Sequence, residues 1–364
     1  MKYVCKKLGI ILLSVIFIVS CVSFAGCNNN NNTNEGDFKV TFNYNYENSE
    51  VSVVGVKKGE KVSRPNDSVR EGYKIYNWYI DAECTVAYDF DSAVTEDITL
   101  YAYWLKDGVE YHDVTIHYGN GKSDSVMKVE DGTRIANPRT EESETAYFAG
   151  WYSDSEYKNK FVFSTKISED MDIYGKWINY SVFEAEDLNL EDFVGRGYSG
   201  EVYGNSAIVY PKENTRNASN NAYVSYLYAS YQSTVDNTTL EFHITASASI
   251  SGAVLAFRIS AEYADITING DMYEVLVNGT KINYEDISLL GTTTDLPFKD
   301  FVISPSVSLH AGDNTITLRT ANTQKQGTGG TMNSTAPLVD CIKIAVDGAS
   351  VSWTDNSDYY KPKN

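Results

Sequence analysis

The feature that most constrains this fold is a sequence pattern that occurs twice between residues 38 and 178. From Gly59 and Gly132 onward, the matching residues lie 73 positions apart. The matched positions include a proline, a Trp-Tyr pair and a closing strand rich in aromatic residues. These are Pro65 and Pro138, residues 78–79 and 151–152, and residues 100–104 and 173–177. A fixed period with matched aromatic residues predicts two copies of one small structural unit.

Each copy is expected to form three or four short strands, with a middle stretch that could carry one helix. Four tryptophans stand at matched positions, and they could form a ligand platform: Trp78, Trp104, Trp151 and Trp177. In a unit of about 70 residues, however, repeated aromatic residues usually fill a small core. The copies are therefore interpreted as stalk or spacer modules, with a direct adhesive role left open.

The repeated pattern resembles the internalin-type B-repeat, also called the Listeria–Bacteroides repeat. The likeness rests on Gly-x-x-Val/Ile, Pro, Trp-Tyr-x-Asp, Phe and a closing Leu-Tyr-Ala-x-Trp, and it covers both copies. The second copy lacks the Arg-Glu-Gly-Tyr turn of residues 70–73 and has Thr-Glu-Glu-Ser at 140–143 instead. The resemblance implies two small β-grasp-like modules of bacterial surface proteins, at residues 38–106 and 110–178.

The first 26 residues are expected to be a lipoprotein signal peptide. Three lysines precede or flank an apolar run at residues 8–18, which is too short to span a bilayer comfortably. Phe-Ala-Gly-Cys at 24–27 resembles a bacterial lipobox, which implies lipidation of Cys27; an ordinary secretion signal is the alternative. Residues 27–37 are rich in asparagine and suit a polar tether. The protein is thus expected at the extracellular face of the cell membrane, held only by its lipid anchor.

The net charge of −19 argues against nucleic acid and anionic membrane surfaces as partners, and leaves neutral glycans open. Beyond the signal and Cys27, the cysteines are Cys84 and Cys341, one in each of two predicted domains. We expect buried thiols rather than a disulfide framework.

Residues 180–348 have the pattern of an all-β domain. Short apolar strands are expected at 240–246, 253–260, 274–277 and 315–319, and clusters of Gly, Asn and Asp separate them. This spacing is typical of a β-sandwich. The polar tail at 349–364 is expected to fray. The predicted fold class is therefore mainly β, with two β-grasp-like repeats followed by a sandwich.

Three acidic residues of this domain are candidates for a metal site. Residues 182–188 predict a strand that places Glu184 and Glu186 on one face, where they repel each other unless a cation or hydrogen-bond donors lie between them. If this first strand pairs with the last one, Asp340 joins them. Carboxylate oxygens are the ligands that calcium prefers. A solvated strand edge and a pair of catalytic acids are the alternatives.

Four short motifs of residues 180–348 resemble the carbohydrate-binding modules of families six and thirty-five, which are calcium-containing β-jelly rolls. They are residues 184–186, 222–227, 309–318 and 338–342, in the family's order. The resemblance implies a structural calcium and a sugar site formed by Tyr226, Phe298 and Asn333. The usual asparagine directly before the last strand is missing, since Pro337 and Leu338 stand there. Tyr226 and Phe298 could instead be core residues, and Asn333 a plain loop residue.

Together these features predict a non-catalytic cell-surface lipoprotein that captures a polysaccharide or oligosaccharide through its C-terminal jelly roll. Separate glycoside hydrolases or transporters are candidate partners. The alternative is an adhesin or structural protein that binds another protein through its repeats. An enzyme is not expected, because no nucleophile–base pair and no phosphate-binding loop is found in the sequence.

Overall fold

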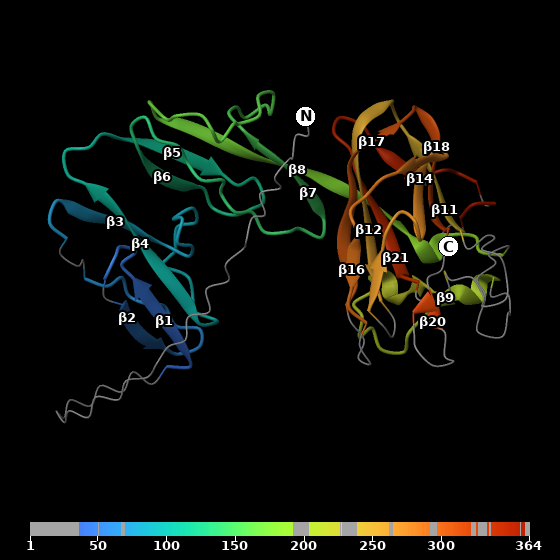
Figure 1. The fold of residues 1–364 in the computed structure, drawn as a ribbon, viewed down its shortest axis with the longest axis horizontal. Coiled ribbons are helices and arrows are strands. Elements are labelled where there is room, and N and C mark those ends of the chain that lie inside the picture. The colour runs from blue at the N-terminus through green and yellow to red at the C-terminus, as the bar shows by residue number, and fades with distance from the viewer. Residues whose placement is uncertain are drawn as a thin grey trace, which may run out of the picture.

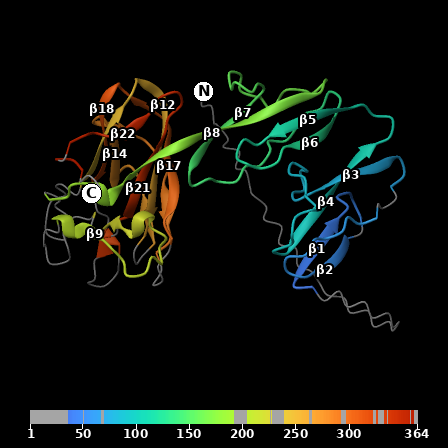
Figure 2. The same cartoon turned by 180° about the vertical axis from the view of Figure 1, so that it is seen from behind.

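The computed structural model describes residues 36–360 except 50, 67–69, 192–203, 226, 228–238, 262–264, 292–296, 322–324, 327–332, 335 and 357. Within these residues the chain forms strands β1 to β22 and three short 3₁₀ helices, which confirms the mainly β fold class. Figure 1 shows two bodies joined by the long strand β8, and Figure 2 shows the same arrangement from behind.

The first repeat is a four-stranded sheet in the order β2-β1-β4-β3. Its strands are β1 (Phe38–Asn43), β2 (Val51–Val56), β3 (Tyr73–Tyr79) and β4 (Ile98–Lys106). The central strands β1 and β4 are parallel, and the outer pairs are antiparallel. Because strand side chains alternate between the two faces, Val40 and Phe42 of β1 point into the same core and are completely buried.

The second repeat has the same topology, built from β5 (Tyr111–His117), β6 (Ser125–Glu130), β7 (Ala146–Tyr152) and the first part of β8 (Met171–Glu184). Both repeats even share a register shift, between Ile75 and Asn77 in one and between Phe148 and Gly150 in the other. The sequence period is thus confirmed as a structural repeat. The helix that the middle stretch could have carried is absent from the described residues of both repeats.

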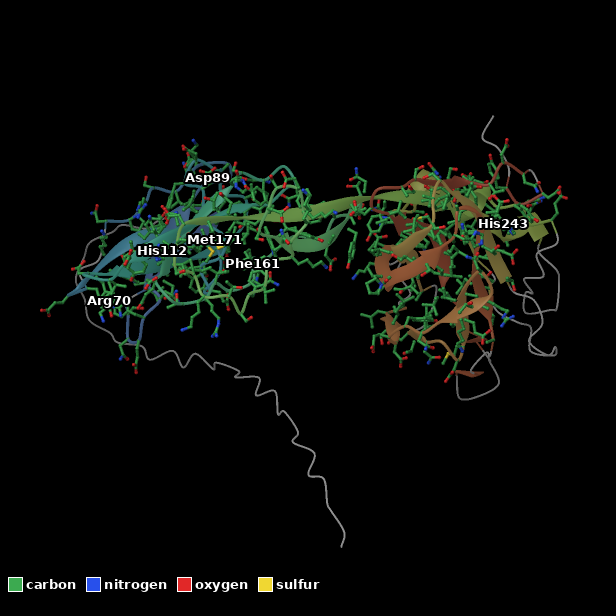
Figure 3. All side chains as sticks on the ribbon, turned by 90° about the horizontal axis from the view of Figure 1, so that it is seen from above. Arg70, Asp89, His112, Phe161, Met171 and His243 are labelled. Carbon is green, nitrogen blue, oxygen red and sulfur yellow. The ribbon has the colours of Figure 1, made fainter. Side chains whose placement is uncertain are left out.

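The four repeated tryptophans are structural. Trp78 and Trp151 are 0% and 3% exposed, so they fill the two cores as the size of the unit predicts. The indole nitrogens of Trp104 and Trp177 donate to the backbone oxygens of Tyr44 and Tyr118, over 2.6 and 2.8 Å. Figure 3 shows the side chains from above, with Phe161 and Met171 close together in the core of the second repeat.

The C-terminal body is a sandwich of two main sheets. One sheet contains β17 (Lys299–Leu309), β12 (Ile250–Ser260), β21 (Leu338–Ala345) and the end of β8, in that order. The other has the order β15 (Thr280–Ile282), β14 (Tyr273–Val277), β18 (Gly312–Thr320), β11 (Thr239–Ala246) and β22 (Val351–Trp353). Apolar residues of both sheets form one large buried cluster between them. We call this body the jelly roll.

Shorter elements lie at the ends and edges of the sandwich. They are η1 (Ala185–Asp187), η2 (Gly204–Ala207), β9 (Ile208–Val209), η3 (Ser219–Asn221), β10 (Tyr223–Val224), β13 (Ile266–Ile268), β16 (Ile287–Leu289), β19 (Lys325–Gln326) and β20 (Asn333–Ser334). The pair β9 and β10 extends the first sheet, because Val224 of β10 pairs with Val339 of β21. The chain from β9 to β10 is therefore held at the edge of β21.

Strand β8 belongs to both bodies. Its first part pairs with β5 and β7, and Tyr180 to Glu184 pair with Ala345 to Cys341 of β21. The predicted boundary between residues 178 and 180 therefore lies inside one continuous strand. Pairing on both sides of that boundary joins the repeat and the jelly roll into one nine-stranded sheet.

The tail after residue 348 does not fray in the part that is described, so that prediction is wrong. Strand β22 pairs with β11, and the Trp353 ring contacts Phe183, Phe242 and Tyr360 with centroids 5.2 to 6.0 Å apart. Stacked aromatic rings bury large apolar areas even in a segment of polar composition. The jelly roll therefore extends beyond the predicted end at residue 348.

Candidate functional site

The three predicted carboxylates converge on one short turn, η3. Ser219 donates from its hydroxyl to Glu184 over 2.6 Å and from its backbone to both oxygens of Asp340, over 3.0 and 3.1 Å. The side-chain amide of Asn220 donates to Glu186 over 3.1 Å. The predicted pairing of the strands that carry Glu184 and Asp340 is confirmed, since Glu184 of β8 lies opposite Cys341 of β21. Strand β21 is not the last strand, however, because β22 follows it. The strand predicted over 182–188, however, ends at Glu184 and continues as η1.

Burial and mutual repulsion weaken the acidity of two of these groups. Burial raises the pKa of Asp340 to about 6, against the lowering effect of hydrogen bonds from Ser219. Burial also raises the pKa of Glu186 to about 7, and the neighbouring Glu184 carboxylate adds to that shift. Both shifts mean that the charged form of each buried carboxyl group depends on hydrogen-bond donors or a positive charge close to it.

Arg258 supplies the positive charge beside Asp340. Its Nε lies 2.8 Å from Asp340 Oδ2, and both residues are buried, at 5% and 0% exposure. The other side of the guanidinium donates to the Asn217 backbone oxygen over 3.0 Å. A buried carboxylate needs such a partner, because an unpaired charge in the protein interior is very costly. Sequence reasoning missed Arg258, since β12 carries it far from either acidic motif.

The carboxylate oxygens of this site meet the requirements of a hard cation only in part. Glu186 Oε2 is buried and has no hydrogen-bond partner within the described residues, so one oxygen is free to bind a cation. Glu184 lies next to it, but Asp340 is already paired with Arg258. In the part of the chain that the structure describes, no group of three or more His, Cys, Asp or Glu is placed to hold a metal ion. The expected set of three ligands is therefore not assembled.

The loop from β9 to η3 presents an exposed aromatic ring next to this turn. Tyr210, directly after β9, is 68% exposed. Asn214 fixes the loop from within, donating to the Ala218 backbone oxygen over 2.7 Å and accepting from its N–H over 2.8 Å. Asn221 donates to the backbone oxygen of Pro211 over 3.1 Å. Tyr210 therefore projects from a loop that its own hydrogen bonds hold in place.

Three asparagines of this loop take left-handed backbone conformations: Asn217, Asn220 and Asn221, with φ between 50 and 57°. Asparagine tolerates this region better than most residues do. Tight turns of this kind let Ser219 and Asn220 reach the carboxylates, while Tyr210 at the start of the loop is exposed to solvent. Sequence reasoning missed Tyr210; the signal that could have found it is an aromatic residue followed by Pro211 in an asparagine-rich loop.

The structure places the predicted sugar-binding residues differently. Phe298 is 3% exposed and packs in a small cluster with Tyr223, with ring centroids 5.4 Å apart. Its ring is a core element here, so the prediction of a stacking face is wrong for Phe298. Asn333 begins β20, but its side chain is not described. Tyr226 and the predicted lipid attachment at Cys27 lie outside the described residues and stay predictions of the sequence.

Comparison with protein families identifies the N-terminal part of the chain. Residues 38–103 and 112–176 match the model of the Listeria-Bacteroides repeat domain. The first body contains two Listeria–Bacteroides repeats. The matched ranges coincide with the two sheets described above, so the resemblance drawn from the Trp-Tyr-x-Asp and closing aromatic motifs is confirmed.

Two curated relatives come from Evansella cellulosilytica, and both are named as membrane proteins, one of them as glycine-rich. They are 33% identical over 172 residues and 35% identical over 149 residues, which is 46% and 40% of this chain. This chain spans only 24% and 17% of their lengths. Among the described residues here, no helix is long and apolar enough to cross a membrane.

Solved structures similar to this chain include a family 35 carbohydrate-binding module from Clostridium thermocellum and one from Paenibacillus barcinonensis. They are 23% and 19% identical, and each alignment covers 46% of this chain and 98% or 99% of the module. Both TM-scores are 0.28, so these likenesses carry no argument about what the chain binds.

Proposed function

We propose that the jelly roll binds carbohydrate, without cleaving it, on the surface around Tyr210. The observation that carries this proposal is an exposed tyrosine ring on a loop that hydrogen bonds hold in one conformation. A pyranose ring has an apolar face that stacks on an aromatic ring, and a rigid platform loses little conformational entropy on binding. The four sequence motifs of residues 180–348 support the same ligand class.

Two observations support a binding role rather than catalysis. Asp340 is fully buried and both of its oxygens accept bonds from Ser219, so a substrate has no access to it. Glu184 and Glu186 each accept a hydrogen bond from a side chain of the turn η3. Two acids that cleave a glycosidic bond have to flank that bond directly. We therefore assign the carboxylates to holding the loop that carries Tyr210.

Tyr210→Ala is expected to weaken retention of the protein in polysaccharide-containing gels by about tenfold, since the stacking surface is removed. Its melting temperature should stay within about 2 °C of that of the unchanged protein, because a surface substitution rarely alters stability further. Tyr210→Phe keeps the ring face and should bind normally. Tyr157→Ala, which removes a partly exposed tyrosine of the second repeat, is the matched control. Retention of Tyr210→Ala equal to the control would contradict the platform.

Calcium is proposed to bind at Glu184 and Glu186 and thereby to stabilise the turn η3. Asp340, which is paired with Arg258, is not part of this proposed site. Millimolar calcium is expected to raise the melting temperature by a few degrees, as binding at about 10⁻⁴–10⁻³ M contributes about 1–2 kcal/mol. Glu186→Gln should abolish the shift. Glu241→Gln changes another carboxylate of the jelly roll, which pairs with His243, and should leave the shift intact. A shift that persists in Glu186→Gln would place the ion elsewhere.

Protein binding through the first repeat is the second candidate, and one observation favours it. The edge strand β2 exposes Val51 and Val53, at 55% and 50%. An exposed edge strand with apolar side chains is a common site for pairing with another protein. If the unchanged, folded protein is retained by no polysaccharide in a broad screen, this strand becomes the surface to test.

A further inference from the structure

One face of the jelly roll is built to receive the second repeat. Arg258 of β12, Asp300 of β17 and Lys343 of β21 lie next to one another on the outer face of the first sheet. The two cations are almost completely buried, at 5% and 4% exposure. Long basic side chains on the outer face of a sandwich normally reach solvent, because burying a charge requires partners for it. The partners of these two cations therefore have to come from the jelly roll itself or from an element that covers this face.

The covering element is the segment just before β7, in the second repeat. Lys343 Nζ donates to the backbone oxygen of Glu144 over 2.8 Å and pairs with Asp300 over 2.7 Å. Arg258 lies 3.5 Å from the Glu144 carboxylate and 3.7 Å from Asp300. The second repeat thus contributes a backbone acceptor for Lys343 and a carboxylate near Arg258. These add to the partners that the jelly roll itself supplies, which are Asp300 for Lys343 and Asp340 for Arg258.

The same segment is tied to β8 and so cannot move independently of it. The backbone N–H of Tyr180 donates to the oxygen of Thr145 over 2.9 Å, and Ala146 pairs with Asn179. The Tyr180 ring also lies 5.8 Å from Lys343 Nζ, in the arrangement of a cation–π contact. A second ion pair, between Lys176 of β8 and Asp347 after β21, links the repeat and the jelly roll at another point.

We propose that the second repeat and the jelly roll form one cooperative folding unit, with residues 143–146 as the element that docks on Arg258, Asp300 and Lys343. The second repeat is then an integral part of the binding module rather than a detachable spacer. The proposal is independent of which ligand the jelly roll takes. It predicts that destabilising the repeat core opens the jelly roll as well, because neighbouring parts of a cooperative unit share their opening free energy.

The test is hydrogen exchange of the full chain, followed by peptide mass spectrometry, with matched variants in the two repeats. Val114 and Val40 are equivalent, completely buried valines of β5 and β1. Val114→Ala is expected to speed exchange about tenfold in peptides of β12 and β21 as well as in the second repeat. Val40→Ala should affect only the first repeat. Unchanged exchange in β12 and β21 of Val114→Ala would overturn the proposal.

A second arm keeps the test decisive if Val114→Ala fails to fold, and it examines the docking residues themselves. Ile116→Val removes less volume from the same core and should give the same pattern with a smaller change. Combining either core variant with Lys343→Met should reduce the response of β12 and β21 to below about threefold. The matched background Lys281→Met breaks a partly exposed ion pair with Glu274 and should leave the response unchanged. Equal responses in both backgrounds would remove Lys343 from the docking element.

Discussion

Arg258→Met is expected to lower the free energy of unfolding by about 3–5 kcal/mol, because it leaves Asp340 buried without its positive partner. Asp340 is completely buried, and the Arg258 Nε at 2.8 Å is the cation nearest to it among the described ion pairs. The same substitution also removes the donor to Asn217, which begins the tight turns of the Tyr210 loop. Urea denaturation of the full chain, followed by circular dichroism, measures the loss.

Two further variants separate the effect of the lost charge on stability from the effect of the lost side-chain packing. Arg258→Met combined with Asp340→Asn removes both charges of the pair and is expected to recover much of the loss, since a neutral amide can still accept from Ser219. Arg319→Met removes an arginine that pairs with Glu274 at the protein surface, and should cost less than about 1 kcal/mol. If Arg258→Met costs no more than Arg319→Met, Asp340 does not depend on the pair.

Trp353→Ala is the other change with a large expected effect, about 2–4 kcal/mol, because this partly buried ring packs against the main core cluster. The ring contacts Phe183 of β8, Phe242 of β11 and Tyr360 of the tail. It therefore joins the first strand of the jelly roll to the last. Trp353→Phe should retain most of the stability, because it keeps an aromatic ring in the stack. The thermal unfolding transition measures both variants.

A chain that ends after residue 348 should lose at least as much stability as Trp353→Ala, since it lacks strand β22 altogether. A truncated chain as stable as the complete one would show that the tail contributes nothing, as its polar composition suggested. A fragment of the jelly roll that is cut at residue 348 would lack the edge strand β22 and the stacked rings of Trp353 and Tyr360.

The repeats were the part of the fold that the sequence predicted best. The signal there is local and occurs twice, because Trp78 and Trp104 have their counterparts at the matched positions of the second copy. The boundary after residue 178 could not be predicted. Nothing in a single sequence distinguishes two strands joined by a short linker from one long strand, and partners on both sides of β8 decide between them.

For the candidate site, the sequence predicted the convergence of Glu184, Glu186 and Asp340, because pairing of the strands that carry Glu184 and Asp340 brings them together. Their actual partners could not be predicted. Ser219 and Asn220 come from a turn in which asparagines take left-handed conformations. Arg258 comes from β12, which is far along the chain from both acidic motifs. For Phe298, the resemblance to the carbohydrate-binding modules predicted an exposed ring. Packing against Tyr223 buries this ring, and the sequence alone did not show that contact.

Strand β8 also determines how this protein responds to mechanical load. It is the covalent path between the repeats and the jelly roll, and its bonds to β5 and β21 lie across the strand direction. Tension between the two bodies therefore pulls β8 lengthwise and loads these hydrogen bonds in shear, many at once. Hydrogen bonds that are loaded in shear share the force. When a hairpin is pulled open from one end, its hydrogen bonds instead break one after another. A force applied to the jelly roll thus acts along the mechanically strongest direction of the sheet.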